Sequence, residues 1–94
     1  MKVRIIEYSD SFAENKDVAK HLRESFIFPA YRDPAEEIVI SFDGIDSSTQ
    51  SFIHALISDL FQRHGEAVLD RIAFQNCSPA IKSLIATVIN YSLE

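Results

Sequence analysis

Three short stretches of the chain alternate apolar and polar side chains, which is the pattern of a strand buried on one face. They cover Lys2–Tyr8, Glu37–Asp43 and Asp70–Gln75. In the first stretch Val3 and Ile5 alternate with charged neighbours, and the second reads Glu-Ile-Val-Ile-Ser-Phe-Asp. The pattern therefore predicts three β-strands, separated by segments long enough to hold other elements.

Apolar residues at helical spacing predict a helix after each strand. The helices are expected from about Lys16 to Phe26, from about Ser48 to His64, and from Pro79 onward. Their apolar stripes consist of Val18, Ala19, Leu22 and Phe26, then Ile53, Leu56, Ile57 and Leu60, then Ile81, Leu84, Ile85 and Val88. In the core we expect Phe42, Leu56, Leu60, Phe74 and Leu84.

Residues that favour helix ends flank these segments. Asn15 is expected as the first N-cap, Gly65 as the stop of the second helix, and Ser78-Pro79 as the start of the third. Ser47 with Gln50 matches an S-x-x-Q capping box at the start of the second helix. Two prolines, Pro29 and Pro34, are expected to bracket the loop that follows the first helix.

The alternation of strands and helices predicts an α/β fold of βαβαβα order with a small, mainly parallel three-stranded sheet. The strand residues expected on one face are Val3, Ile5, Ile38, Ile40, Phe42, Ile72 and Phe74, and those on the other are Arg4, Ile6, Val39, Ser41, Arg71 and Ala73. A sheet covered on both sides would show continuous apolar runs. We therefore expect three helices mostly on one face, in a single domain over residues 1–94.

Composition and charge narrow the function classes. Apolar residues make up 47% of the chain and charged residues 24%, which is typical of a globular domain. The formal net charge is −5, and the nine basic residues are scattered along the chain. Nucleic-acid binding needs clustered Lys and Arg, so it is not expected.

The N-terminal sequence and the cysteine content indicate a cytoplasmic protein. A lone cysteine, Cys77, cannot form an internal disulfide and fits a reducing compartment. No long apolar run is present, so neither a signal peptide nor a membrane span is expected.

The search for catalytic groups points away from an enzyme. None of the three histidines has metal-ligand spacing with Cys, Asp or Glu, and two glycines are too few for a phosphate loop. Cys77 has no base assigned to it and is expected to be a half-buried turn residue. Asp43 and Asp46 flank Gly44 and are expected to form a turn rather than a magnesium site. We expect no enzymatic activity, no metal and no cofactor.

The polar run that leads from the second strand into the second helix is the candidate binding segment. It is hydroxyl-rich and lies at a helix N-terminus, where added negative charge is stabilised. The candidate partner-binding residues are Asp46, Ser47, Ser48, Thr49, Gln50 and Ser51.

Three segments, residues 38–45, 49–52 and 72–82, resemble the STAS-like domains of bacterial proteins, which are related to sulfate-transporter and anti-sigma-factor-antagonist (STAS) domains. The third segment is similar to that family's last strand and its turn of asparagine, small residue and serine into a helix. In anti-sigma-factor antagonists an Asp-Ser-Ser-Gly turn is phosphorylated at its first serine. The strand register places that position at Gln50, which cannot accept phosphate, and puts Ser51 at the second serine, so Ser51 is the candidate phospho-acceptor.

The resemblance implies a non-catalytic regulatory or adaptor domain that binds a protein partner, with a kinase-like ATPase as the implied partner. Two other functions stay open: a short inhibitor or interaction protein from a mobile element, and a small-molecule or nucleotide sensor that uses the Asp43–Ser51 turn. A homodimer through the open sheet face or an exposed edge is a further hypothesis, because Ile6, Val39 and Ala73 would expose apolar surface on that face beside Arg4 and Arg71.

Overall fold

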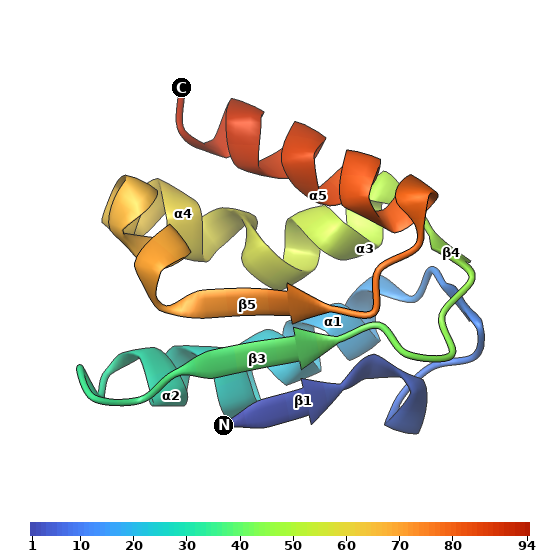
Figure 1. The fold of residues 1–94 in the computed structure, drawn as a ribbon, viewed down its shortest axis with the longest axis horizontal. Coiled ribbons are helices and arrows are strands. Elements are labelled where there is room, and N and C mark those ends of the chain that lie inside the picture. The colour runs from blue at the N-terminus through green and yellow to red at the C-terminus, as the bar shows by residue number, and fades with distance from the viewer.

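Three parallel strands form the sheet on which the molecule is built. The computed structural model describes all residues 1–94, and its central sheet consists of β1 (Lys2–Arg4), β3 (Ile38–Ser41) and β5 (Ile72–Gln75). The strand order is β1-β3-β5, and Ile40 pairs with Val3 on one side and Phe74 on the other (Figure 1). The strands are shorter than the sequence pattern predicted.

The order of the strands explains why the helices share one face. Each strand lies next to its predecessor and the sheet grows in one direction, so two crossovers of the same right hand place their helices on the same side. In Figure 1 the helices lie behind and above the strands, and the sheet face toward the viewer carries none. The predicted fold of a three-stranded parallel sheet with three helices is confirmed.

Each of the first two helices is continuous but changes pitch midway. The first comprises α1 (Lys16–Leu22), the π-helical segment η2 (Arg23–Ile27) and α2 (Phe28–Tyr31). The second, called the central helix below, comprises α3 (Gln50–Ile53), the π-helical segment η3 (His54–Ser58) and α4 (Asp59–His64). The third is α5 (Pro79–Ser92). None of these helices is long and apolar enough to cross a membrane.

Short elements complete the chain. Two 3₁₀ turns, η1 (Ile5–Glu7) and η4 (Gly65–Asp70), follow β1 and the central helix. Two two-residue strands, β2 (Phe12–Ala13) and β4 (Ser47–Ser48), form a second small parallel sheet that the sequence pattern did not predict.

The central helix is apolar on almost all sides, as expected of a helix enclosed by other elements. It packs between the first helix and α5. Its buried residues are Phe52, Ile53, Ala55, Leu56, Ile57, Ser58, Leu60 and Phe61. The one buried hydroxyl among them is satisfied, because the Oγ atoms of Ser58 and Ser92 lie 2.8 Å apart and Ser92 donates to the Val88 carbonyl. The hydrophobic core is therefore organised around this helix.

The two faces of the sheet differ as predicted. Val3, Ile38, Ile40 and Ile72 are buried beneath the helices, whereas the open face exposes Lys2, Arg4 and Gln75. Phe42, Leu56 and Leu60 are buried as predicted, but Phe74 and Leu84 are only half-buried. The reason is position: Phe74 lies on an edge strand, and Leu84 lies beside the buried stripe of α5 rather than within it.

Two residues expected on the open face lie elsewhere. The chain leaves β1 after Arg4, and Ile6 packs against Gly44, where an added Cβ would lie 3.2 Å from Ile6 Cγ1. Gly44 also has φ of +84°, so a side chain there would be strained as well as crowded. Arg71 precedes β5 and turns toward the loop before β3. The open face is therefore less apolar than the dimer hypothesis assumed, although Val39 and Ala73 remain half-buried on it.

The first helix runs past the proline that was expected to end it. It continues to Tyr31, with Pro29 in its last segment, so only Pro34 lies in the following loop. A proline ring clashes with the carbonyl four residues earlier in a regular α-helix. Here the wider π-helical turn over Arg23–Ile27 lies immediately before Phe28 and provides the extra room.

Three of the four predicted helix ends are observed in the structure. Asn15 caps α1 by accepting from the Asp17 N–H at 2.9 Å, and Ser78 caps α5 by accepting from the Ile81 N–H at 3.2 Å. Gly65 ends the central helix with φ of +68°. These predictions are confirmed, whereas the cap at Ser47 is not, as described below.

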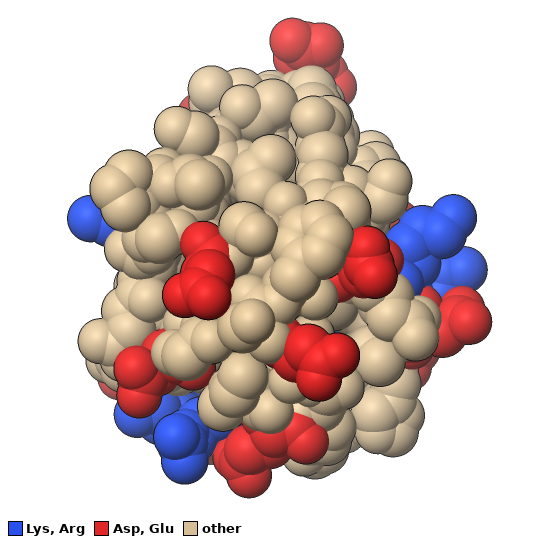
Figure 2. All heavy atoms as spheres, turned by 90° about the vertical axis from the view of Figure 1, so that its right-hand side faces the viewer, with Lys and Arg blue, Asp and Glu red and all other residues tan.

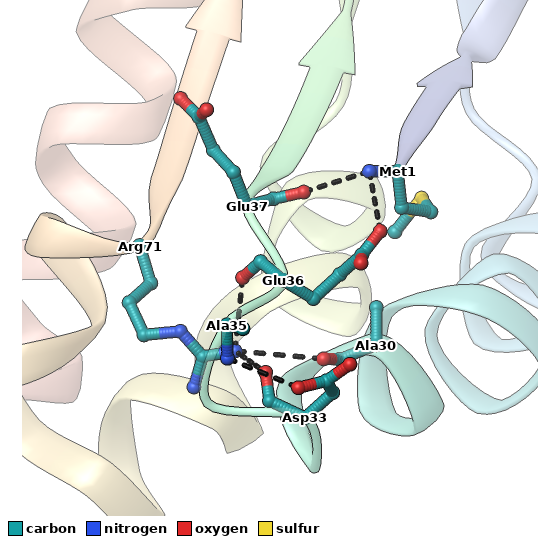
Figure 3. Close-up of polar contacts among 7 residues, drawn as sticks. All are labelled: Met1, Ala30, Asp33, Ala35, Glu36, Glu37 and Arg71. Atoms are coloured by element: carbon teal, nitrogen blue, oxygen red, sulfur yellow. Dashed lines mark hydrogen bonds and ion pairs between the residues drawn. The ribbon is translucent and has the colours of Figure 1, made fainter.

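Arg71 fastens the loop between the first helix and β3 (Figure 3). Its guanidinium donates to the carbonyls of Tyr31 and Glu36 at 3.0 Å each and also to that of Asp33. It lies 4.2 Å from the centre of the Tyr31 ring. On the other side of the loop the Met1 ammonium contacts the Glu36 carboxylate at 2.6 Å. One side chain thus satisfies several carbonyls of the loop before β3 at once.

Replacing Leu60 by Ala is expected to destabilise the fold by about 2–5 kcal/mol, because the side chain is 1% exposed in the core. The matched control is Leu69→Ala, whose leucine is 51% exposed and should cost no more than about 0.5 kcal/mol. Urea unfolding followed by circular dichroism measures both. Equal stability of the two variants would show that the assigned face of the central helix is wrong.

Replacing Arg71 by Lys keeps the charge but removes the fork of donors, and we expect a loss of about 1–3 kcal/mol. The loop carbonyls of Asp33 and Glu36 would lose their partner. Arg32→Lys, at an exposed arginine of the same loop region, should change the unfolding free energy by less than about 0.5 kcal/mol. Unchanged stability of Arg71→Lys would contradict the fastening role.

Candidate functional site

The candidate segment Asp46–Ser51 lies at the end of the molecule where the parallel strands terminate (Figure 1). In open parallel α/β sheets ligands usually bind outside these carboxyl ends of the strands. Its first half is pinned by β4, which pairs in parallel with β2: Ser47 opposes Phe12 and Ser48 opposes Ala13. A segment that reads as a loop in the sequence is therefore part of a small sheet.

The hydroxyl groups at the centre of the segment serve the fold. Thr49 is the N-cap of the central helix and accepts from the Phe52 N–H at 3.1 Å. Ser48 Oγ donates to the Ala13 carbonyl at 2.7 Å, and the Thr49 N–H donates to the same oxygen at 3.0 Å. Neither hydroxyl is therefore free for a ligand without breaking these contacts.

The capping box predicted at Ser47 and Gln50 is wrong. The helix begins two residues later than that box requires, with Thr49 as cap and Gln50 as the first helical residue. Ser47, Ser48 and Thr49 each carry a hydroxyl that could cap a helix. Because Ser47 and Ser48 pair with β2 as a strand, the helix can begin only after them, and Thr49 is the cap. That pairing joins residues more than thirty positions apart, so no local pattern reveals it.

The outer residues of the segment point to two different surfaces. The Asp46 backbone is held on both sides: its N–H donates to the Ser11 carbonyl at 2.8 Å and its carbonyl accepts from Ser78 Oγ at 3.2 Å. Its carboxylate is exposed and unpaired. Gln50 and Ser51 are exposed in the first helical turn, on the side of α1, with no side-chain hydrogen bond. The structure thus separates Asp46 from Gln50 and Ser51.

The surface around Asp46 is acidic and is called the acidic end below. Figure 2 views this end of the molecule and shows carboxylates spread over it, with basic side chains only at its margins. Segments 5–15 and 42–49 contain no Lys or Arg, and their five carboxylates are all exposed: Glu7, Asp10, Glu14, Asp43 and Asp46. These two segments therefore contain no basic side chain that balances the carboxylates. The density of negative charge at this end is higher than an even spread of the net charge of −5 over the surface would give.

Two aromatic side chains are exposed within the acidic end. Tyr8 is 40% exposed and Phe12 is 45% exposed, and both line a hollow of about 460 Å³ together with Glu7, Asp10 and Glu14. Aromatic residues are enriched at surfaces that bind proteins, so the two exposed rings favour such a role for this end. Sequence analysis missed Tyr8 and Phe12. The apolar residue at position 12 of a polar stretch was the available signal.

The Asp43–Ser51 turn is formed without help from its aspartate side chains. The Ile45 N–H donates to the Phe42 carbonyl at 2.9 Å, and the Asp43 N–H donates to Ser41 Oγ at 3.3 Å. The turn expected here is therefore present at Asp43 and Gly44, but backbone groups and Ser41 form it, without side-chain bonds from Asp43 or Asp46. No three His, Cys, Asp or Glu side chains gather in a group that could hold a metal ion.

The remaining reactive side chains are engaged with neighbours. His21 lies near the rings of Tyr8 and Phe26, His54 contacts the Tyr91 hydroxyl at 2.8 Å, and His64 stacks on Tyr31. Cys77 is half-buried, as expected, and burial raises the pKa of its thiol above the ordinary value, with the charge of Lys82 opposing the shift. At neutral pH this thiol therefore stays protonated, which disfavours its use as a nucleophile.

Comparison with known proteins agrees with this geometry. Neither the curated proteins nor the solved structures that were searched gave a match to the chain. A family model described as a STAS-like domain of unknown function matches residues 18–82, which hold the sheet strands β3 and β5, the central helix and the candidate segment. The match covers more than half of the chain, and the chain therefore belongs to the family of STAS-like domains of unknown function.

Proposed function

We propose that this chain is a non-catalytic regulatory domain that binds a protein partner through its acidic end, with the segment Asp46–Ser51 at the border of the contact. The observation that carries the proposal is the combination of five exposed carboxylates with exposed Tyr8 and Phe12 on one end of the molecule. Membership in the STAS-like family supports a regulatory role.

The chemistry of the acidic end defines the partner. Five carboxylates without a local counter-charge attract a surface rich in Lys and Arg, and such complementarity speeds association and sets orientation. Tyr8 and Phe12 supply apolar area at the centre, where contact residues contribute most of the affinity. A cationic side chain on the partner can also stack on either ring. The proposed partner is a folded protein with a basic docking surface, and a kinase-like ATPase of this kind is the candidate.

The rigidity of the surface favours binding. Phe12 belongs to β2, Asp46 is bonded on both sides of its peptide unit, and Ser48 and Thr49 bond to Ala13. The loops that carry the contact residues are thus already ordered, so association costs less conformational entropy than it would for mobile loops.

The turn itself is less suited to a nucleotide. Asp43 and Asp46 would repel phosphate groups, and the segment's central hydroxyls are already bonded to the protein. This argues against a sensor site formed by the part of the turn from Asp43 to Thr49, whereas Gln50 and Ser51 face a separate groove.

Reversing one charge in the acidic end is expected to weaken partner binding. The protein is used to capture partners from cells that encode it, and the affinity of the captured partner is then measured for Asp46→Lys. We expect a loss of about tenfold or more without a change in unfolding temperature, since the carboxylate makes no contact within the fold. The matched control is Asp70→Lys, an exposed aspartate outside the acidic end. Equal affinity of the two variants would contradict the proposal.

Ser51→Asp tests whether the helix start tolerates a phosphoserine-like charge. The residue is exposed in the first turn of the central helix, where a carboxylate is favoured by about 0.3–1 kcal/mol. We expect thermal unfolding to be unchanged or slightly raised. Ser83→Asp, further from a helix start in α5, should show no gain. A marked loss of stability in Ser51→Asp would show that the hydroxyl has a structural role.

A further inference from the structure

A second concave surface lies on the other side of the helix start from the acidic end. It is a groove of about 530 Å³ between the first helix, the start of the central helix and the end of α5, and it is called the basic groove below. Its lining includes three cationic side chains, Lys16, Lys20 and Arg23, together with Gln50, Ser51, His54 and Tyr91, and no carboxylate. In a chain of nine basic and fourteen acidic residues, a third of the cations converge here.

The charges of the groove are only partly balanced. Arg23 donates to the Ala55 carbonyl at 3.1 Å and contacts Glu24 at 2.9 Å and Asp59 at 4.0 Å, so its position is fixed and its charge is shared. Lys16 and Lys20 form no ion pair. They lie one helical turn apart on the same face of α1, where like charges repel. An anion between them would relieve that repulsion.

Uncharged donors face the same space. The side chains of Gln50 and Ser51 line the groove and make no hydrogen bond within the protein. Their backbone N–H groups belong to the first turn of a helix that is continuous to His64, so they have no intrahelical acceptor. Two lysines, a hydroxyl, an amide and free N–H groups form a set of donors that suits a phosphoryl group.

The far wall of the groove is aromatic. The rings of His54 and Tyr91 are 5.6 Å apart and are fixed by a 2.8 Å hydrogen bond between His54 Nδ1 and the Tyr91 hydroxyl. The π-helical segments begin at Arg23 and His54, two residues of the lining, and such distortions of helices occur frequently at functional sites. The groove thus joins an anion-attracting half to a half that can pack against an organic group.

From this arrangement we infer that the basic groove binds a small molecule through a phosphate group, held by Lys16, Lys20 and Ser51, with any organic part against His54 and Tyr91. The volume lies within the range of small-molecule sites, and three cationic side chains line the same groove. This inference and the proposed function can fail separately, because the hollow of the acidic end and the basic groove share no lining residue, and only Gln50 and Ser51 lie both in the groove and at the border of the proposed contact.

The test is a nuclear magnetic resonance titration of the full ¹⁵N-labelled chain at constant ionic strength with inorganic phosphate, AMP and adenosine. Phosphate or AMP should cause saturable shifts of the amides of Gln50, Ser51 and His54 in the millimolar range or below. Tighter binding of AMP than of phosphate and adenosine would assign the site to a phosphorylated organic molecule. Equal binding of AMP and phosphate would assign it to the phosphate group alone.

The variant Lys16→Gln/Lys20→Gln should weaken this binding by about tenfold or more, because it removes two charge-assisted contacts. The matched control is Lys2→Gln/Lys82→Gln, which removes the same charge from exposed positions outside the groove and should bind like the wild type. As a second variant, Ser51→Ala keeps every charge and should also weaken binding. A hexaglutamate peptide is titrated as well, as a carboxylate ligand without phosphate. The inference is overturned if neither phosphate nor AMP saturates, or if the two double variants lose binding equally. It is also overturned if only the hexaglutamate peptide shifts these amides.

Discussion

The burial of the central helix is the constraint on which the rest of the structure depends. A helix whose residues from Phe52 to Phe61 are almost all buried must be enclosed by the sheet, the first helix and α5 at once. Because other elements enclose the central helix, the direction of its axis and the position of its first turn are fixed. Because Thr49 caps that turn and Ser48 bonds to Ala13, the same constraint positions β2, β4 and both surfaces proposed to bind other molecules.

The start of the central helix separates two surfaces of opposite charge. On one side lies the acidic end, with Tyr8 and Phe12 among its carboxylates; on the other lies the basic groove with Lys16 and Lys20. Asp46 and Ser51 are five positions apart in sequence yet belong to different surfaces. An anion in the basic groove would therefore lie next to a segment, Asp46–Ser51, that also borders the proposed partner-binding surface.

The sequence predicted the features that periodicity controls. The three strands, the three helices, the parallel arrangement and the uncovered sheet face all follow from apolar spacing and from the alternation of elements. The caps at Asn15 and Ser78 were predictable because one polar residue stands directly before an apolar period. The resemblance carried by residues 38–45, 49–52 and 72–82 pointed to the STAS-like family to which the chain belongs.

What escaped prediction depends on contacts between distant segments. The pairing of Phe12–Ala13 with Ser47–Ser48 moves the helix start to Gln50, and the π-helical turn carries the first helix through Pro29. The basic groove assembles cations that look scattered along the chain, and the acidic end assembles carboxylates from two loops. Local patterns determine which elements form, whereas the two surfaces proposed to bind other molecules arise only when those elements pack.

The most direct measurement of the functional claim is site-specific photo-crosslinking to the captured partner. A photoreactive phenylalanine analogue is placed at Phe12 in the acidic end and, in a separate protein, at Leu69, which is an equally exposed apolar position elsewhere. The account predicts a crosslinked partner from position 12 and none from position 69. Crosslinking from position 69 alone, or from both positions equally, would contradict the acidic end as the partner-binding surface.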